Sequence, residues 1–328
     1  MVVRVHDIEH NMTSIIDDFY FTLQRGESLS ALVNEDIILN AAYPIEQIIG
    51  INAIEKDFWQ LFKNAFEHFE RKAFIEFDSV YEDDRWIAAT GYFSGIFVND
   101  FLGIPATGNL LYLRFTELVK ITNDRISEYF IIFDFLDVMH QVGIYPLRKS
   151  LGHCGQILPP TTMDGLSPVE VNKFQAAESE QLVLNMLDEL GKFDGKSLLS
   201  MQLDKYWHPD FMWYGPAGIG TTKGIKSFRE HHQGPFVFSF PDRAVDHKAC
   251  VVKKGNYVAT GGWPHMHGTH SAGGWLGLPP TNKKLELRVI DIWRREGNLL
   301  KENWVGIDII HMCKQMGLDV FALMKTSV

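Results

Sequence analysis

A long stretch of this 328-residue chain occurs twice, and the repeat constrains the fold more than any other feature of the sequence. Residues 102–146 align without a gap on residues 276–320, at a constant shift of 174 positions. The identical pairs are Leu102/Leu276, Gly103/Gly277, Pro105/Pro279, Thr107/Thr281, Leu111/Leu285, Leu113/Leu287, Arg114/Arg288, Glu128/Glu302, Asp134/Asp308, Gln141/Gln315 and Gly143/Gly317. Self-similarity of this kind indicates a duplicated structural unit. We therefore predict one domain in residues 1–150, a Gly- and Pro-rich linker in residues 151–166 and a second domain in residues 167–328.

Each copy is predicted to be an α+β domain. Apolar residues within 14–25 follow helical spacing, and residues 29–39 and 45–62 are expected to form further short helices. From Lys72 onward the apolar period approaches two, which is typical of antiparallel strands. Helices followed by a sheet predict helices packed on one face of a curved antiparallel sheet.

The second copy is expected to open with a helix whose N-cap is Ser167, because Pro168 and Glu170 complete a capping signature. After it, the sequence predicts strands at residues 236–240, 244–253 and 257–270.

Residues 299–310, LLKENWVGIDII, are predicted to form a strand that is buried on both faces and carries one acid, Asp308. Alternation places Trp304, Gly306 and Asp308 on one face, and Val305 and Ile307 on the other. The first face is expected to border a small pocket, in which burial would raise the pKa of the carboxyl group and make it a proton acceptor. The alternative is a buried ion pair with Arg288, which is repeated as Arg114.

The two copies differ in ways that favour a roomier and more polar pocket in the second. Gly306 stands where the first copy has Ile132, so more space is expected beside Trp304. His265, His267 and His270 follow one another on a predicted strand and could donate hydrogen bonds to a substrate oxygen. Their spacing also suggests a metal, but His270 falls on the opposite strand face, and we predict that no metal binds. Asp291 and Glu117 are expected to be solvated charges near a turn.

Composition excludes several classes of protein. The net charge is −10 and no Lys/Arg cluster occurs among aromatic residues, which argues against nucleic-acid and anionic membrane surfaces. The N-terminus lacks the apolar core of a secretory signal, and no run of about 18 apolar residues occurs. A cytoplasmic protein is expected. Cys154, Cys250 and Cys313 are too scattered to predict a disulfide framework or a zinc knuckle.

Three sequence stretches, taken together, carry a family resemblance. They are the loop GGWLGLPPT at residues 273–281, with NDFLGIPAT at 99–107 in the first copy; the run REGNLLKENWVGID at 295–308; and the QMG at 315–317. The chain resembles the SnoaL-like polyketide cyclase family of the nuclear transport factor 2-like (cystatin-like) superfamily, in two tandem copies. The resemblance implies cone-shaped α+β domains, each enclosing a pocket, and ring closure by proton removal next to carbonyl groups without metal or cofactor. The family's catalytic aspartate maps onto Asp308 and, in the first copy, onto Asp134.

We consider three functions. The first is a cofactor-free enzyme, such as an ester cyclase, isomerase, hydratase or other lyase, that acts on a carbonyl-bearing small molecule with Asp308, His265 and His267 as catalytic residues. The second is a non-catalytic binding protein for an aromatic or apolar ligand, and the third is a role in assembly, through homo-oligomers or pairing of the two domains. The expected ligand-binding residues are Trp304, Trp263, His270, Trp293, Arg288 and Asp134.

Overall fold

The computed structural model describes residues 14–166, 168–246 and 248–326. The chain forms two mixed sheets, each with its own helices. In the first domain the elements are α2 (Ile15–Arg25), η1 (Leu29–Ala31), β1 (Val33–Ala41), β2 (Glu46–Ile49), α3 (Ile51–Ala53), the π-helix η2 (Ile54–Trp59), α4 (Gln60–Ala65), β3 (Phe66–Tyr81), β4 (Asp84–Phe97), β5 (Leu110–Thr122), β6 (Arg125–Phe133) and α5 (Phe135–Gln141).

The second domain repeats this order, but two short strands, β9 and β10, stand in place of the long edge strand β3. Its elements are α6 (Gln175–Leu190), η3 (Leu198–Met201), η4 (Leu203–Lys205), β7 (Trp207–Tyr214), β8 (Thr222–Lys223), α7 (Gly224–Phe228), the π-helix η5 (Arg229–Gln233), α8 (Gly234–Ser239), β9 (Ala244–Val245), β10 (Cys250–Lys254), β11 (Tyr257–Thr269), η6 (Trp275–Gly277), β12 (Lys284–Glu296), β13 (Leu299–Ile307), α9 (Ile309–Met316) and α10 (Val320–Thr326). The strand order is β2-β1-β6-β5-β4-β3 in the first sheet and β10-β11-β12-β13-β7-β8 in the second, with β9 also paired to β11.

The predicted repeat is confirmed in detail. The bounds of β5 and β6 become those of β12 and β13 when 174 is added to each residue number. The shift also holds in the first half of each domain, because Val33 pairs with Ile126 as Trp207 pairs with Leu300. Residues 174 positions apart can therefore be compared directly across most of the two domains.

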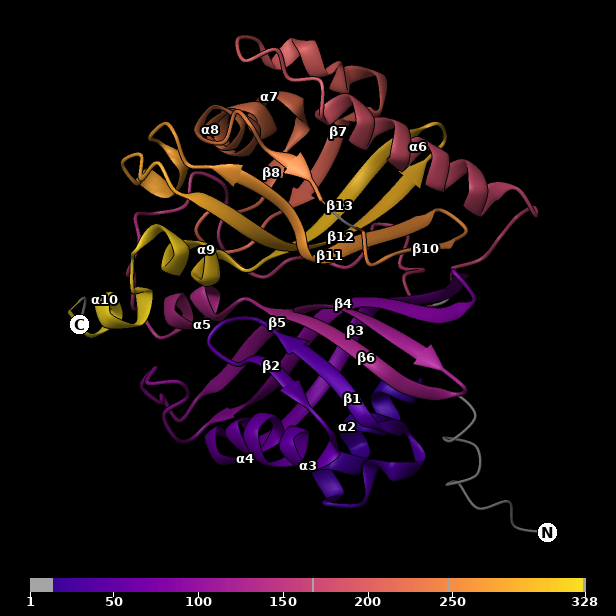
Figure 1. Cartoon of the computed structure of the whole chain (residues 1–328), viewed down its shortest axis with the longest axis vertical. Helices are drawn as coiled ribbons and strands as arrows, with labels where there is room; N and C mark the ends of the chain where they lie inside the picture. Colours follow the sequence, from indigo (N-terminus) through magenta and orange to yellow (C-terminus); the bar gives the residue numbers. More distant parts are fainter. Residues whose placement is uncertain (1–13, 167, 247, 327–328) are drawn as a thin grey trace.

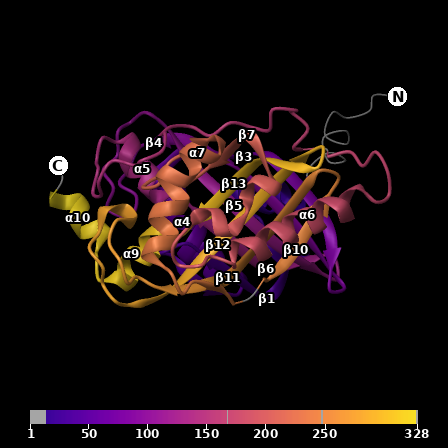
Figure 2. The same ribbon diagram turned by 90° about the horizontal axis from the view of Figure 1, so that it is seen from above.

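Figure 1 shows four layers. The two sheets lie face to face in the middle, α2, α3 and α4 cover the outer face of the first sheet, and α6, α7 and α8 cover that of the second. Seen from above in Figure 2, α6 and α7 lie over the strands of the second sheet, and α9 and α10 lie at one end of the molecule. No helix in the described residues is long and apolar enough to cross a membrane.

Four predictions of local structure are wrong. Residues 33–41 form the strand β1, because parallel pairing with β6 outweighs the helical reading of the segment. Residues 236–240 fall largely in α8, and residues 244–253 form two separate strands, β9 and β10. The helix α6 begins at Gln175 rather than near Pro168, and Ser167 lies outside the described residues.

The contact between the two sheets is a second hydrophobic core. It includes Phe130 and Ile132 from the first sheet, and Ile290, Ile292 and Trp304 from the second, all nearly inaccessible. Gly306 lies in this contact, because a Cβ placed on it would lie 3.0 Å from Cβ of Thr116 and 3.4 Å from Cβ of Ile132. The glycine therefore lets the two sheets approach each other. Our expectation that it would open a pocket beside Trp304 is wrong.

Candidate active site in the second domain

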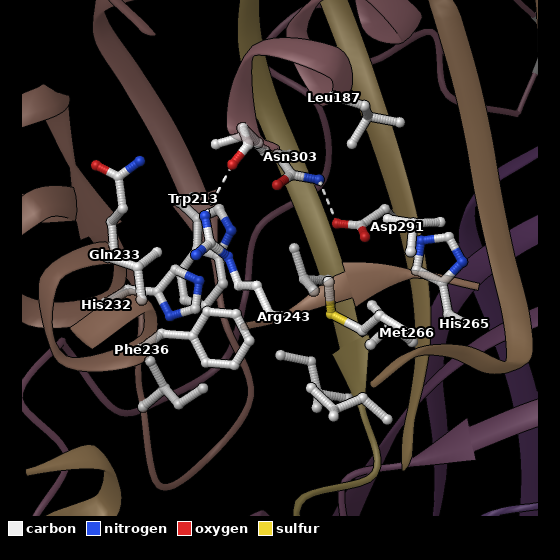
Figure 3. A pocket seen from close by; sticks show the side chains of 18 of the residues that line it. Leu187, Trp213, His232, Gln233, Phe236, Arg243, His265, Met266, Asp291 and Asn303 are labelled. Atoms are coloured by element: carbon white, nitrogen blue, oxygen red, sulfur yellow. Dashed lines mark hydrogen bonds between the residues drawn. The ribbon is translucent and has the colours of Figure 1, made fainter. Parts of the chain in front are cut away.

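A cavity of about 180 Å³ lies between the second sheet and its helices. Most of its walls are aromatic or aliphatic, and the polar lining residues are His232, Gln233, Arg243, His265, Asp291 and Asn303. Gly191, Ala244 and Val245 line it and are also exposed, so they mark its mouth between the end of α6 and β9. Figure 3 shows His232, Gln233, Trp213 and Phe236 on one side of the cavity, and Asp291, Asn303 and His265 on the other.

The cavity exists because large side chains of the first domain are replaced by smaller ones. At positions 174 apart, Phe115 becomes Val289, Phe133 becomes Ile307, Tyr129 becomes Asn303 and Trp59 becomes Gln233. In the first domain these four side chains are at most 5% exposed, and each packs against neighbouring aromatic rings of the core.

The sheet edge changes as well. In the first domain, Arg71 of the long strand β3 is the cross-strand partner of Phe93 in β4. The corresponding cross-strand pair in the second domain is Val245 of β9 and Met266 of β11. Because β9 has only two residues and is separate from β10, the edge of the second sheet leaves the cavity open.

Asp291 is the carboxyl group of this cavity. It lies in the middle of β12 and shares a strand face with the lining residues Val289 and Trp293. Asn303 Nδ2 donates to Asp291 Oδ1 at 3.2 Å, and Oδ2 receives no hydrogen bond from the described residues. Burial raises the pKa of Asp291 to about 7, while the hydrogen bond from Asn303 opposes the rise. A carboxyl group with this pKa can both accept and return a proton near neutral pH.

The equivalent acid in the first domain, Glu117, is fully paired. Arg71 donates to Glu117 Oε1 through Nε at 3.1 Å and Nη2 at 2.5 Å, and the Tyr129 hydroxyl donates to Oε2 at 2.5 Å. Glu117 is 0% exposed, and burial raises its pKa to about 7 against the opposing charge of Arg71. Both carboxylate oxygens are therefore paired with side chains of the packed core.

The opposite wall of the cavity carries a neutral imidazole. His232 lies in the π-helix η5, a distortion that is frequent at functional sites, and stacks on Trp213 with ring centroids 3.9 Å apart. Burial, and secondarily the positive charge of Arg243, lowers the pKa of His232 to about 3. His232 Nδ1 is buried without a hydrogen-bond partner.

Asp308 lies outside the cavity, and the prediction that it stands on the strand is wrong. The strand β13 ends at Ile307, and Asp308 is the N-cap of α9, accepting from the backbone N–H of His311 at 3.1 Å. Its Oδ2 accepts from the backbone N–H of Tyr43 in the first domain at 2.9 Å and from Arg288 Nη1 at 3.3 Å. The ion-pair alternative therefore describes its surroundings. Burial raises the pKa of Asp308 to about 6, and these donors oppose the rise.

Asp134 has the equivalent position in the first domain. It caps α5 by accepting from Asp137 N at 3.1 Å, and its Oδ2 accepts from Ala217 N of the second domain at 2.8 Å. Ala217 is the counterpart of Tyr43, so the two bonds between domains are related by the repeat. We call the pair formed by Asp134–Ala217 and Asp308–Tyr43 the reciprocal clasp.

Two predicted site residues, His265 and Trp293, line the cavity. Trp304 instead stacks on Tyr214 and donates through Nε1 to the linker carbonyl of Leu158 at 2.9 Å. Trp263 lies under the Arg288 guanidinium, 4.7 Å from the ring centroid, and beside Phe130 at the sheet contact.

The other two predicted histidines also lie outside the cavity lining. His267 pairs with Asp246 near the surface. His270 is fully buried, stacks on Phe240 and bonds Thr281 Oγ1 at 3.2 Å. The bulge of β11 between Gly262 and Met266 separates His265 from these two residues. Within the described ranges no group of three His, Cys, Asp or Glu side chains could hold a metal ion.

The sequence reasoning missed the polar residues Asp291, Asn303, His232, Gln233 and Arg243. Asp291 carried a usable signal, because it alternates with Val289 and Trp293 in an apolar strand and repeats the acid Glu117. Reading the two acids as solvated charges near a turn was wrong, since both lie in mid-strand. His232 and Arg243 come from irregular segments that the sequence pattern did not place.

The chain was compared with curated protein sequences and with solved structures. No curated protein sequence matches the chain. The solved structures it resembles include a protein from Jannaschia named as a SnoaL-like polyketide cyclase, with 14% identity, TM-score 0.38, and coverage of 45% of this chain and 97% of that one. They also include IdmH from Streptomyces antibioticus, named as a polyketide cyclase, with 21% identity, TM-score 0.34, and coverage of 43% and 99%.

The family comparison covers most of the sequence. A sequence model described as SnoaL-like polyketide cyclase matches residues 11–142 and again residues 196–316. The two matches fall on the two α+β domains and together cover more than half of the chain. The chain therefore belongs to the SnoaL-like polyketide cyclase family and carries two tandem copies of its domain.

Proposed function

We propose that the second domain is a cofactor-free acid/base catalyst that acts on a carbonyl-bearing small molecule in its cavity. The observation that carries the proposal is Asp291, a half-buried carboxyl group that lines the cavity, whose pKa is raised to about 7 and whose Oδ2 receives no hydrogen bond from the described residues. Isomerisation, aldol-type cyclisation and dehydration next to a carbonyl group can each begin with the transfer of a proton from carbon to such a base.

The chemical step is a proton transfer from carbon to oxygen. Asp291 accepts a proton from the carbon next to the substrate carbonyl, the C–H electron pair moves into the carbon–carbon bond, and negative charge develops on the carbonyl oxygen. Asn303 holds the carboxylate in place through its hydrogen bond. His265, which lines the cavity and lies near Asp291 in Figure 3, is the residue that we assign to the developing oxyanion.

The size and lining of the cavity favour a small, flat substrate. An apolar cavity of about 150 Å³ holds benzene, so a cavity of about 180 Å³ suits one or two rings. Trp207, Trp213, Trp275 and Trp293 supply aromatic walls.

Hydrogen–deuterium exchange at carbon tests the proposal. With 2-tetralone as the probe in D₂O, the wild-type protein should accelerate loss of the α-protons, followed by NMR. Asp291→Asn should reduce that acceleration about 100-fold or more, because the amide cannot accept the proton, while binding of the ketone is kept. Exchange that persists in Asp291→Asn would contradict the assigned base.

The alternative is a binding protein of the same fold, and the mostly apolar lining favours it. Under that alternative the wild-type protein binds 2-tetralone, and its α-protons exchange at the rate found in buffer.

A further inference from the structure

Arg243 is a cation at the edge of the cavity that lacks a carboxylate partner in the described part of the chain. Its Nη2 donates to the carbonyl of Leu190 at 2.8 Å and contacts Met201 Sδ at 3.4 Å. The structure shows no hydrogen bond from its Nε or Nη1 and no salt bridge to a described acid. In the first domain, by contrast, Arg71 has three acidic partners, Asp17, Glu76 and Glu117.

Arg243 lies where it could bind one end of a ligand that occupies the cavity. It directly precedes Ala244 and Val245, which mark the mouth of the cavity, and it lines the cavity itself. Figure 3 shows its guanidinium on the side of Trp213 and His232, opposite Asp291. Burial lowers the pKa of Arg243 to about 10, which leaves the group cationic at neutral pH.

Other polar atoms on the same side are also unsatisfied. His232 Nδ1 and Gln233 Oε1 are buried without hydrogen-bond partners, and Gln233 is only 3% exposed. Buried polar atoms in folded proteins are normally paired, so this group points to a polar part of a ligand. A guanidinium whose Nε and Nη1 make no hydrogen bond to the described residues prefers an anion, above all a carboxylate.

We propose that the cavity binds an aromatic carboxylate, with the carboxylate group held by Arg243 at the mouth and the ring system between the tryptophan walls. This inference rests on the proposed use of the cavity for a small molecule, and it adds the chemical class of the ligand. The acid group lies at one end, and the reacting carbon lies at the other end beside Asp291.

The test compares two probes of the same shape, 2-naphthoate and its neutral carboxamide, 2-naphthamide, by calorimetry at neutral pH. The wild-type protein should bind the carboxylate about tenfold or more tightly than the carboxamide, as expected for one charge-assisted contact. Arg243→Gln should bring the ratio close to one while changing 2-naphthamide affinity less than about threefold. Arg243→Lys should keep a clear preference for the carboxylate. Arg125→Gln, at an exposed arginine of the first domain far from the cavity in sequence, is the control for net charge and should leave the ratio unchanged.

The proposal is overturned if the wild-type protein binds both probes equally, if it binds neither, or if Arg243→Gln leaves the preference intact. Asp291→Asn separates this result from the proposed catalysis. A carboxylate preference that survives in Asp291→Asn, together with an absence of proton exchange in the wild-type protein, would support the ligand class and reject the enzyme. Proton exchange in the wild-type protein without a preference for the carboxylate would support the enzyme and reject the ligand class.

Discussion

The two domains share one fold and differ in what fills the space between sheet and helices. In the first domain, aromatic rings and Arg71 occupy that space, and Arg71 neutralises Glu117. In the second, smaller side chains leave a cavity, and the equivalent acid Asp291 has one amide as its partner. The paired bonds of the reciprocal clasp, in contrast, obey the repeat. The two copies therefore share this pair of interdomain bonds, while one interior is a packed core and the other contains a cavity.

The largest expected effect lies in the first interior. Arg71→Met leaves Glu117 buried without its cation and should lower the free energy of unfolding by about 3–5 kcal/mol. The double variant Arg71→Met/Glu117→Gln should recover much of that loss, because no unpaired charge remains. Urea denaturation of the single and double variants measures both. Equal stability of Arg71→Met and the wild-type protein would show that the cluster does not hold the first core together.

Exchanging the residues at one equivalent position, Phe115 and Val289, should open a cavity in the first domain and fill the cavity of the second. Phe115→Val should cost about 2–4 kcal/mol of stability, because it opens a cavity in a packed core. Val289→Phe places the ring of the first domain into the empty space and should weaken 2-naphthoate binding about tenfold or more, with a stability change within about 1 kcal/mol. Unchanged 2-naphthoate affinity in Val289→Phe would place the ligand elsewhere.

The pH dependence of stability should separate Asp291 from an ordinary surface acid. Its pKa is raised in the folded protein to about 7. The folded state therefore holds a proton that the unfolded chain releases near pH 4, and stability is full below that pH and falls as pH rises to about 7. Asn cannot ionise, so Asp291→Asn should match the wild-type protein at pH 4 and exceed its stability by about 3–4 kcal/mol at pH 7. A parallel pH profile for the two proteins would contradict this assignment.

The smallest effects are expected at the reciprocal clasp. Asp134→Ala and Asp308→Ala should each cost about 1 kcal/mol, since each removes a helix cap and one bond between the domains. The two costs should be similar, and 2-naphthoate affinity should stay unchanged in both. A loss of binding confined to Asp308→Ala would return that acid to the ligand site.

The repeat, the α+β class and the strands β5, β6, β12 and β13 could be predicted because they depend on local alternation and on turns that occur twice. The strand β1 could not, since it is fixed by a parallel partner about 90 residues away in the chain. The site was harder to predict for a related reason. The alternation of β13 showed that two faces exist, but only the packing of the second sheet against the first shows that Trp304 and Gly306 face the neighbouring domain while Asn303, Val305 and Ile307 face the cavity.

The aspartate assigned from the family resemblance, Asp308 with its equivalent Asp134, shows the same limit of prediction from sequence. Asp134 and Asp308 are repeated because both begin a helix and bond the opposite domain, and this requirement applies equally to both copies. A site used in one copy is marked by difference, as Asp291 and Asn303 are when set against Glu117 and Tyr129. Identity between the copies pointed to structure, and the divergent positions point to the proposed chemistry.

The most direct test measures α-proton exchange of 2-tetralone in three matched carboxyl-to-amide variants, Asp291→Asn, Glu117→Gln and Asp308→Asn. We expect exchange to be lost in Asp291→Asn and to stay within about twofold of the wild-type rate in the other two, provided that each variant is folded. Loss of exchange in Asp308→Asn with activity retained in Asp291→Asn would contradict the account and would move the active site to the interface between the domains.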